Sequence, residues 1–185
     1  GAQHRGTRLC PLTAGNAIAL RARLDWLRPT YLDLGTSFGF GDRLGLATPG
    51  HVRAIQGKPI FPIFAQQSIR EMDRTGRSPR KVLNTAIWGV FEEGYEEGFG
   101  ADADHLKSRD AVESTAELGF NMFTCDPSEY VNDRADSMDP TELNKAYNEM
   151  DIGDGLIAKY EDRTFKCSLS NNDYQFEGTF EVKDI

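Results

Sequence analysis

Alternating apolar and polar segments along the middle of the chain predict a repeated strand and helix order. Four short apolar runs are typical of buried strands, and they lie at 36–40, 60–65, 99–107 and 120–125. Helical segments with apolar residues at three- and four-residue spacing separate these runs. Because strands that alternate with helices form parallel sheets with right-handed crossovers, we predict four β-α units in a barrel-like domain over residues 36–133.

The helix boundaries are marked by the same kinds of residue. Thr48-Pro49 and Ser78-Pro79 place an N-cap hydroxyl before a proline in the first turn, which favours helix initiation. Ser108 is the expected N-cap of a helix over 109–118 that glycine then ends. The helix that begins at Ser78-Pro79 is predicted to extend to about Glu97, and to fray before that residue because acidic side chains are unfavourable at the negative end of the helix dipole.

The two ends of the chain follow other patterns. Residues 1–35 form a lead-in with one amphipathic helix predicted from Asn16 to Leu27. Residues 134–185 predict an inserted or appended α+β segment, truncated at its end, with a helix over 140–150. Short antiparallel strands are expected there, at 156–160, 164–168 and 174–180.

The predicted fold class is therefore α/β, a partial (β/α) barrel-like parallel sheet with an appended α+β segment. The chain has 185 residues, and a complete (β/α)8 barrel typically needs roughly 250.

Composition narrows the possible partners and location. The net charge is -8, from 21 basic and 29 acidic residues, so no nucleic-acid partner is expected. No apolar run approaches the roughly 20 residues of a membrane helix, so no membrane partner is expected either. Cys10, Cys125 and Cys167 are far apart in the sequence and predict reduced thiols in a cytoplasmic protein.

Polar clusters follow each of the four predicted strands. In a parallel sheet, chemistry gathers at the carboxyl ends of the strands, so we expect these clusters to share one rim. Each cluster alone has a second interpretation, as a loop that caps the next helix. The clusters are Gly41-Asp42-Arg43, Gln66-Gln67, Asp104-His105-Leu106-Lys107 and Asp126-Pro127-Ser128-Glu129.

The third cluster has the most chemical capacity. Asp104, His105 and Lys107 offer a proton carrier, a metal ligand and an anion anchor, although a charged strand end is the alternative. One histidine cannot hold a catalytic metal, which typically needs about three protein ligands. Arg43 offers a fork for a carboxylate, or else a structural pair with Asp42. The glycine spacing around it is not that of a dinucleotide loop.

Four segments of the chain together resemble the tagaturonate epimerase family. They are Phe38–His51, Ile63–Met72, Gly100–Lys107 and Phe123–Tyr130. The resemblance implies a metal-dependent, barrel-like bacterial isomerase that interconverts tagaturonate and fructuronate in hexuronate breakdown. It also implies a longer chain, of which this is the N-terminal portion, so that the remainder of the same protein completes the site.

A weaker likeness, to class II metal-dependent aldolases, suggests roles for single residues. These enzymes place an Asp-His pair on one strand and an Asp-x-Ser-Glu stretch on the next. The likeness implies Asp104 as catalytic acid/base and His105 as ligand of a divalent cation (zinc, manganese or nickel). The residues expected to bind the sugar-acid substrate are Gly41, Asp42, Arg43, Gln66, Lys107, Asp126 and Ser128.

The predicted function is thus a metal-dependent hexuronate epimerase that works by retro-aldol and aldol chemistry. The inverting carbon is β to the ketone, so simple enolisation cannot invert it. The alternatives are a class II-type aldolase, and a non-catalytic carbohydrate-binding or half-barrel fragment.

Overall fold

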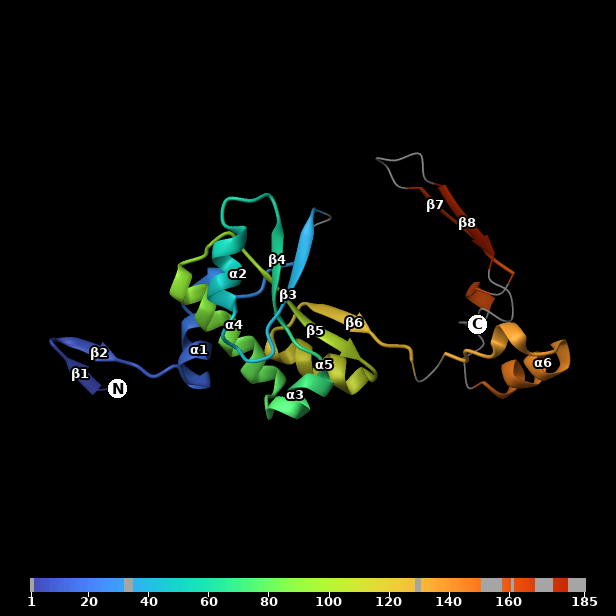
Figure 1. Cartoon of the computed structure of the whole chain (residues 1–185), viewed down its shortest axis with the longest axis horizontal. Coiled ribbons are helices and arrows are strands. Elements are labelled where there is room, and N and C mark those ends of the chain that lie inside the picture. The colour runs from blue at the N-terminus through green and yellow to red at the C-terminus, as the bar shows by residue number, and fades with distance from the viewer. Residues whose placement is uncertain are drawn as a thin grey trace. The chain divides into compact units, whose positions relative to one another are not determined.

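Figure 1 shows the computed structural model of the chain, which describes residues 2–31, 35–128, 131–150, 158–160, 162–168 and 175–179. The chain divides into two compact units, Gly1–Glu129 and Tyr130–Ile185. Within the described residues, no helix is both long enough and apolar enough to span a membrane.

The first unit is built on a parallel sheet of four strands in the spatial order β3-β4-β5-β6. The strands are β3 (Ser37–Gly41), β4 (Phe61–Gln66), β5 (Gly100–Leu106) and β6 (Met122–Cys125). Each strand pairs with the one before it in sequence, as in an arc of a (β/α) barrel. The arc is open, and this arrangement confirms the predicted α/β, partial barrel-like class.

The helices that follow strands β3, β4 and β5 keep close to the predicted boundaries. They are α2 (Thr48–Ile55), α3 (Ile69–Thr75), α4 (Pro79–Glu93) and α5 (Arg109–Leu118). Ser68, Ser78 and Ser108 each accept the backbone N–H three residues ahead, which satisfies a free donor of the first turn.

One boundary sharpens the prediction and one differs from it. Helix α4 ends at Glu93, before Glu97 as expected, and Gly94 stops it there by adopting the left-handed conformation with φ 58°. Thr48 is the first residue of α2 and not its cap, since the N-cap position is Ala47.

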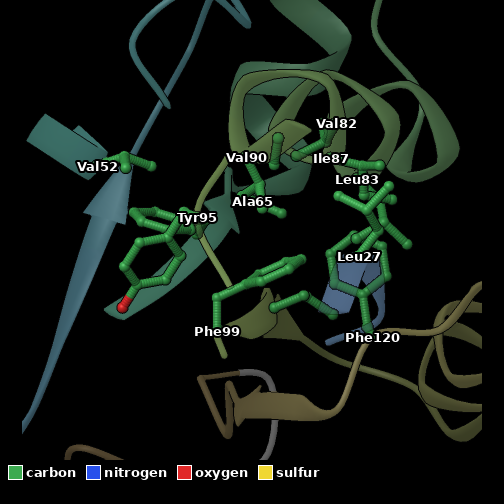
Figure 2. Packing of buried hydrophobic residues seen from close by; sticks show 14 of the residues in the cluster. Leu27, Val52, Ala65, Val82, Leu83, Ile87, Val90, Tyr95, Phe99 and Phe120 are labelled. Atoms are coloured by element: carbon green, nitrogen blue, oxygen red, sulfur yellow. The ribbon is translucent and has the colours of Figure 1, made fainter. Parts of the chain in front are cut away.

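The hydrophobic core lies between the sheet and helix α4. Phe64, Phe99, Leu83, Ile87 and Val90 are almost fully buried there. Figure 2 shows Phe99, Leu83, Ile87 and Val90 among their neighbours in the core. Burial of each such side chain contributes roughly 1.5–3 kcal/mol. This packing fixes the strands that carry the polar clusters.

The lead-in contains more structure than predicted. It begins with a hairpin of β1 (Ala2–His4) and β2 (Thr7–Leu9), which the sequence pattern did not reveal. Helix α1 (Ala14–Arg21) is shorter than expected. Leu24 is extended, with φ -119° and ψ 99°, so the chain resumes only as a 3-10 turn, η1 (Asp25–Leu27).

The described residues of the second unit include a helix and a hairpin. The elements with defined bounds there are the 3-10 turn η2 (Ala135–Ser137), α6 (Pro140–Glu149), β7 (Thr164–Ser168) and β8 (Gln175–Thr179). Strands β7 and β8 pair antiparallel, as predicted. The strand predicted at 156–160 is wrong over 158–160, which are helical, because so short a pattern does not separate the two periods. Positions 156 and 157 lie outside the described residues.

Candidate functional site at the carboxyl edge of the sheet

The two central strands each contain a β-bulge near the carboxyl edge of the sheet. The register of β3 with β4 shifts between Gly39 and Gly41, and that of β5 with β6 shifts between Asp102 and His105. Ala65 and Asp104 lie at these bulges in the left-handed region, with φ of 58° and 64°. This conformation is costly outside glycine, and it concentrates at functional sites.

A buried polar network joins the two bulged strands. Asp102 is only 1% exposed. Its Oδ2 accepts a hydrogen bond of 2.9 Å from Nε2 of Gln66, and its Oδ1 accepts one of 2.8 Å from the backbone N–H of Asp104. The hydroxyl of Thr124 on β6 lies 3.3 Å from Oδ2 and 3.4 Å from Oδ1. The network therefore ties three neighbouring strands together.

Asp104 and His105 form a close pair beyond this network. Nδ1 of His105 lies 2.5 Å from Oδ1 of Asp104. The Asp104 side chain is 14% exposed and that of His105 is 59% exposed. A carboxylate on Nδ1 fixes the ring orientation and leaves Nε2 as the nitrogen that can bind a ligand.

Two surface pockets meet at Asp104, and His105 lines the second of them. One, of about 670 Å³, lies over the ends of β3 and β4, and the other, of about 640 Å³, lies over the ends of β5 and β6. Asp104 and Glu71 line both pockets. The first pocket also contains Gly41, Asp42, Arg43 and Gln66, and the second also contains His105, Lys107, Asp126 and Ser128. The structure thus brings every candidate site residue to the same edge of the sheet.

The carboxylate of Asp42 is engaged within its own loop. Oδ1 accepts the N–H groups of Leu44, Gly45 and Leu46, and Oδ2 accepts that of Ala47. Burial by itself raises the pKa of Asp42, but these four hydrogen bonds outweigh it and the net pKa is lowered. Asp42 therefore shapes the wall of the first pocket and leads the chain into α2.

A buried arginine supports the same loop. Arg77 is 8% exposed. Its guanidinium donates to the carbonyl of Asp42 at 2.8 Å, to Oε1 of Gln67 at 2.5 Å and to Oγ1 of Thr85 at 2.6 Å. Gly45 leaves room for it, since a Cβ there would lie 2.6 Å from Nη2 of Arg77. The side chain of Arg77 thus links the Asp42 loop to Gln67 and to helix α4.

Cationic groups reach both pockets. Arg43, in the first pocket, is 76% exposed, and its Nε pairs with Glu71 from α3. Lys107 lines the second pocket.

The carboxylate of Asp126 also lies in the second pocket, where its Oδ1 accepts the backbone N–H of Ser128 at 3.0 Å. The hydrogen bonds from Ser128 lower the pKa of Asp126, and the nearby charges of Lys107 and His105 lower it further.

Asp102, Glu71 and Arg77 were not among the sequence-predicted site residues, whereas Gln67 was expected at the rim only as a member of the cluster after the second strand. Asp102 had a detectable signal, since it lies two residues before Asp104 in an alternating strand pattern. Arg77 had none, because it lies between a helix stop and a helix start.

The described residues supply only part of a metal site. Among them, no three His, Cys, Asp or Glu side chains converge in a way that could hold a metal ion. His105 fits as one ligand, because its Nδ1 already contacts a carboxylate, as in most metal-binding histidines.

Together, the fold and the site define an arc of a (β/α) barrel with an Asp-His pair at its carboxyl edge, which is the catalytic edge of barrel enzymes. The chain matches the tagaturonate epimerase family, UxaE, over residues 1–182, and it belongs to this family.

Individual relatives agree with that assignment. The tagaturonate/fructuronate epimerase of Thermotoga maritima is 50% identical over 141 residues, which are 76% of this chain and 29% of that protein. The native crystal structure of fructuronate-tagaturonate epimerase UxaE from Cohnella laeviribosi is 36% identical, with a TM-score of 0.79. A form with one glycerol bound has the same TM-score, over 100% of this chain and 37% of that one. The chain thus spans well under half the length of these relatives.

Proposed function

We propose that the protein interconverts tagaturonate and fructuronate, and that the carboxyl edge of the sheet forms part of its active site. The observation that carries the proposal is the Asp104–His105 pair, which lies at a bulge between two pockets in a chain of the tagaturonate epimerase family. The remainder of the same protein completes the site around a small sugar acid.

The proposed chemistry is a retro-aldol cleavage followed by re-addition. Asp104 accepts the proton of the inverting hydroxyl through Oδ2, while the bond from the inverting carbon to the carbon beside the ketone breaks. The bonding electrons move onto the ketone oxygen as an enediolate, and the alcohol becomes an aldehyde. The aldehyde rotates, the enediolate adds to its other face, and Asp104 returns the proton to the new alkoxide.

A divalent cation is part of this proposal. His105 would hold it through Nε2, with other ligands from outside the described residues. When bound, such a cation supplies Lewis-acid stabilisation of negative oxygen atoms.

The substrate carboxylate requires a cation in one of the pockets. Arg43 lines the first pocket, and its terminal Nη groups extend beyond the Nε that pairs with Glu71. Lys107 lines the second pocket. A planar guanidinium matches a carboxylate better than an ammonium group does, so Arg43 is the proposed anchor, with Lys107 facing the hydroxyl groups.

Isotope labelling tests both the function and the mechanism. The protein expressed from its source gene is incubated with tagaturonate in D2O, and the products are followed by NMR. We expect fructuronate that retains its original hydrogen at the inverted carbon. Substrate deuterated at that carbon should react without a primary isotope effect, since no bond to this hydrogen breaks.

Other outcomes would contradict one part of the proposal each. Deuterium entering the inverted carbon, or a primary isotope effect there, would reject the retro-aldol route but keep the epimerase. Sugar-acid binding without any turnover would reject the epimerase and favour a carbohydrate-binding protein.

A further inference from the structure

The buried carboxylate of Asp102 has no part in the proposed chemistry, yet the site is built around it. An acidic side chain that is 1% exposed is costly to bury unless its oxygens are well satisfied. All the hydrogen-bond partners that the described chain offers to Asp102 are donors, as an acceptor-only carboxylate requires. Its neighbours Ala101 and Ala103 belong to the apolar core on the other face of β5.

Asp102 connects the two strained positions of the sheet. Its Oδ1 accepts the N–H of Asp104, the residue with φ 64°. Its Oδ2 accepts from Gln66, which directly follows Ala65 with φ 58°. A single carboxylate therefore holds both bulges, and each bulge brings a side chain to the first pocket.

The neighbouring strand is shaped to admit this network. A Cβ on Gly39 would lie 2.8 Å from Oε1 of Gln66, so only glycine leaves the Gln66 amide in place. The network thus extends from Gln66 on β4, through Asp102 on β5, to Thr124 on β6, and Gly39 on β3 leaves room for it.

We propose that Asp102 is a positioning residue for the Asp104–His105 pair. Its carboxylate holds the backbone of Asp104 in the left-handed conformation, which brings Oδ1 of Asp104 to Nδ1 of His105. This inference rests on the proposed function, because the positioned groups are the proposed proton carrier and metal ligand. Side-chain support of this kind keeps reacting groups within the narrow range of productive geometry.

The test compares three variants in the protein expressed from its source gene. Asp102→Ala removes both acceptors, whereas Asp102→Asn keeps one oxygen that can accept the N–H of Asp104. Thr124→Val is the matched control, since it removes only the longest contacts to the same carboxylate. We expect kcat to fall on the order of 10²-fold for Asp102→Ala, because misplacement by about 1 Å has that effect. Asp102→Asn should lose less than about tenfold and Thr124→Val less than about twofold, with KM little changed in all three.

A spectroscopic readout separates positioning from the function itself. The Nδ1 proton of His105, bonded to Asp104, should give a low-field NMR signal that His105→Ala assigns. We expect Asp102→Ala to remove this signal and Asp102→Asn to keep it, whether or not the protein turns over tagaturonate. Absence of turnover in the unmodified protein would therefore reject the proposed function and leave this test intact.

Three results would overturn the inference. The first is Asp102→Ala with kcat within about twofold of the unmodified protein. The second is Asp102→Asn with a loss as large as that of Asp102→Ala, which would indicate that Asp102 itself carries the proton. The third is a His105 signal unchanged by Asp102→Ala. Should Asp102→Ala fail to fold, Asp102→Asn decides alone, since loss of the His105 signal there also overturns the inference.

Discussion

Asp42 and Asp104 look alike in the sequence, since each lies in a polar cluster at the end of a parallel strand. Their carboxylates nevertheless have different partners in the structure. Both oxygens of Asp42 accept backbone N–H groups from its own loop. Asp104 lines both pockets, and its Oδ1 contacts Nδ1 of His105. Its backbone N–H donates a hydrogen bond to the carboxylate of Asp102.

The difference shows that the partners of a carboxylate, more than its position, decide what it can do. Asp42 cannot take a proton without losing hydrogen bonds that hold its loop, so its contribution is to the shape of the pocket. The side-chain contact of Asp104 is with His105 and not with backbone N–H groups of a loop, which suits the proton transfer proposed above. Mutations should therefore separate catalysis from stability at these two positions.

The largest expected effect is on turnover at Asp104. Asp104→Asn should reduce epimerisation on the order of 10²–10⁴-fold, because the amide keeps the shape but cannot carry the proton. The bound metal should stay near normal, since His105 keeps its Nε2. Turnover assays with metal analysis check this, and Asp110→Asn, an exposed change on α5, is the control. Near-full turnover in Asp104→Asn would assign the proton transfer to another group.

The next effect is on the stability of the Asp42 loop. Arg77→Met should lower the free energy of unfolding by about 3 kcal/mol, because Gln67 and the carbonyl of Asp42 lose a buried donor. Urea unfolding measures the change, and Arg80→Met, at an exposed site three residues on, should have little effect. Equal losses in the two variants would show that the buried contacts of Arg77 contribute nothing specific.

A smaller and pH-dependent effect is expected at Asp42 itself. Asp42→Asn should lower the free energy of unfolding by about 1–2 kcal/mol at pH 6, because the backbone N–H groups of its loop lose a charged acceptor. The folded pKa of Asp42 lies below its ordinary value, so the stabilisation is complete above the unfolded pKa of about 3.9. The gap between the two proteins should therefore shrink as the pH falls below about 4. A gap independent of pH would mean that the charge of Asp42 is not involved, and Asp73→Asn on α3 is the exposed control.

The smallest effect is expected at the far end of α2. Arg53 donates to Glu93 on α4 through Nε at 2.9 Å and Nη2 at 2.6 Å, in an exposed pair. Arg53→Ala should lower Tm by less than Asp42→Asn does. The Tm difference between Arg53→Ala and the unmodified protein should shrink in about 1 M salt, where the Debye length falls to about 3 Å. Thermal melts at two salt concentrations check this. A salt-independent loss would instead indicate a packing role for the Arg53 side chain.

Much of this fold was predictable because its signals are local. The hydroxyl of Ser108 and the left-handed Gly119 fix the bounds of α5 with little help from the rest of the chain. The order of the parallel strands follows from short right-handed crossovers. The convergence of Arg43, Gln66 and His105 at one edge then follows from the geometry of the sheet.

The features that the sequence did not predict depend on contacts between segments that are distant in the chain. The left-handed backbone of Asp104 exists because Asp102 accepts its N–H, and the position of Asp102 depends on Gln66 from another strand. The sequence likewise does not predict that the carboxylate of Asp42 binds its own loop. Arg77, which follows α3, donates a hydrogen bond to that loop. The cross-strand bulges therefore had no local signature.

The backbone at Ala65 has a consequence for how this position can change over generations. Exchange for glycine would relieve roughly 1–2 kcal/mol of left-handed cost, but it would remove a buried methyl group, which contributes about 0.8 kcal/mol. Glycine also costs roughly 0.5–1 kcal/mol more than alanine in backbone conformational entropy. The three terms together nearly cancel, so an exchange of Ala65 for glycine should change thermal stability little. Glycine would, however, make the backbone of the bulge that carries Gln66 more flexible. Substitution of Ala65 by glycine during evolution should therefore lower activity before it lowers thermal stability measurably.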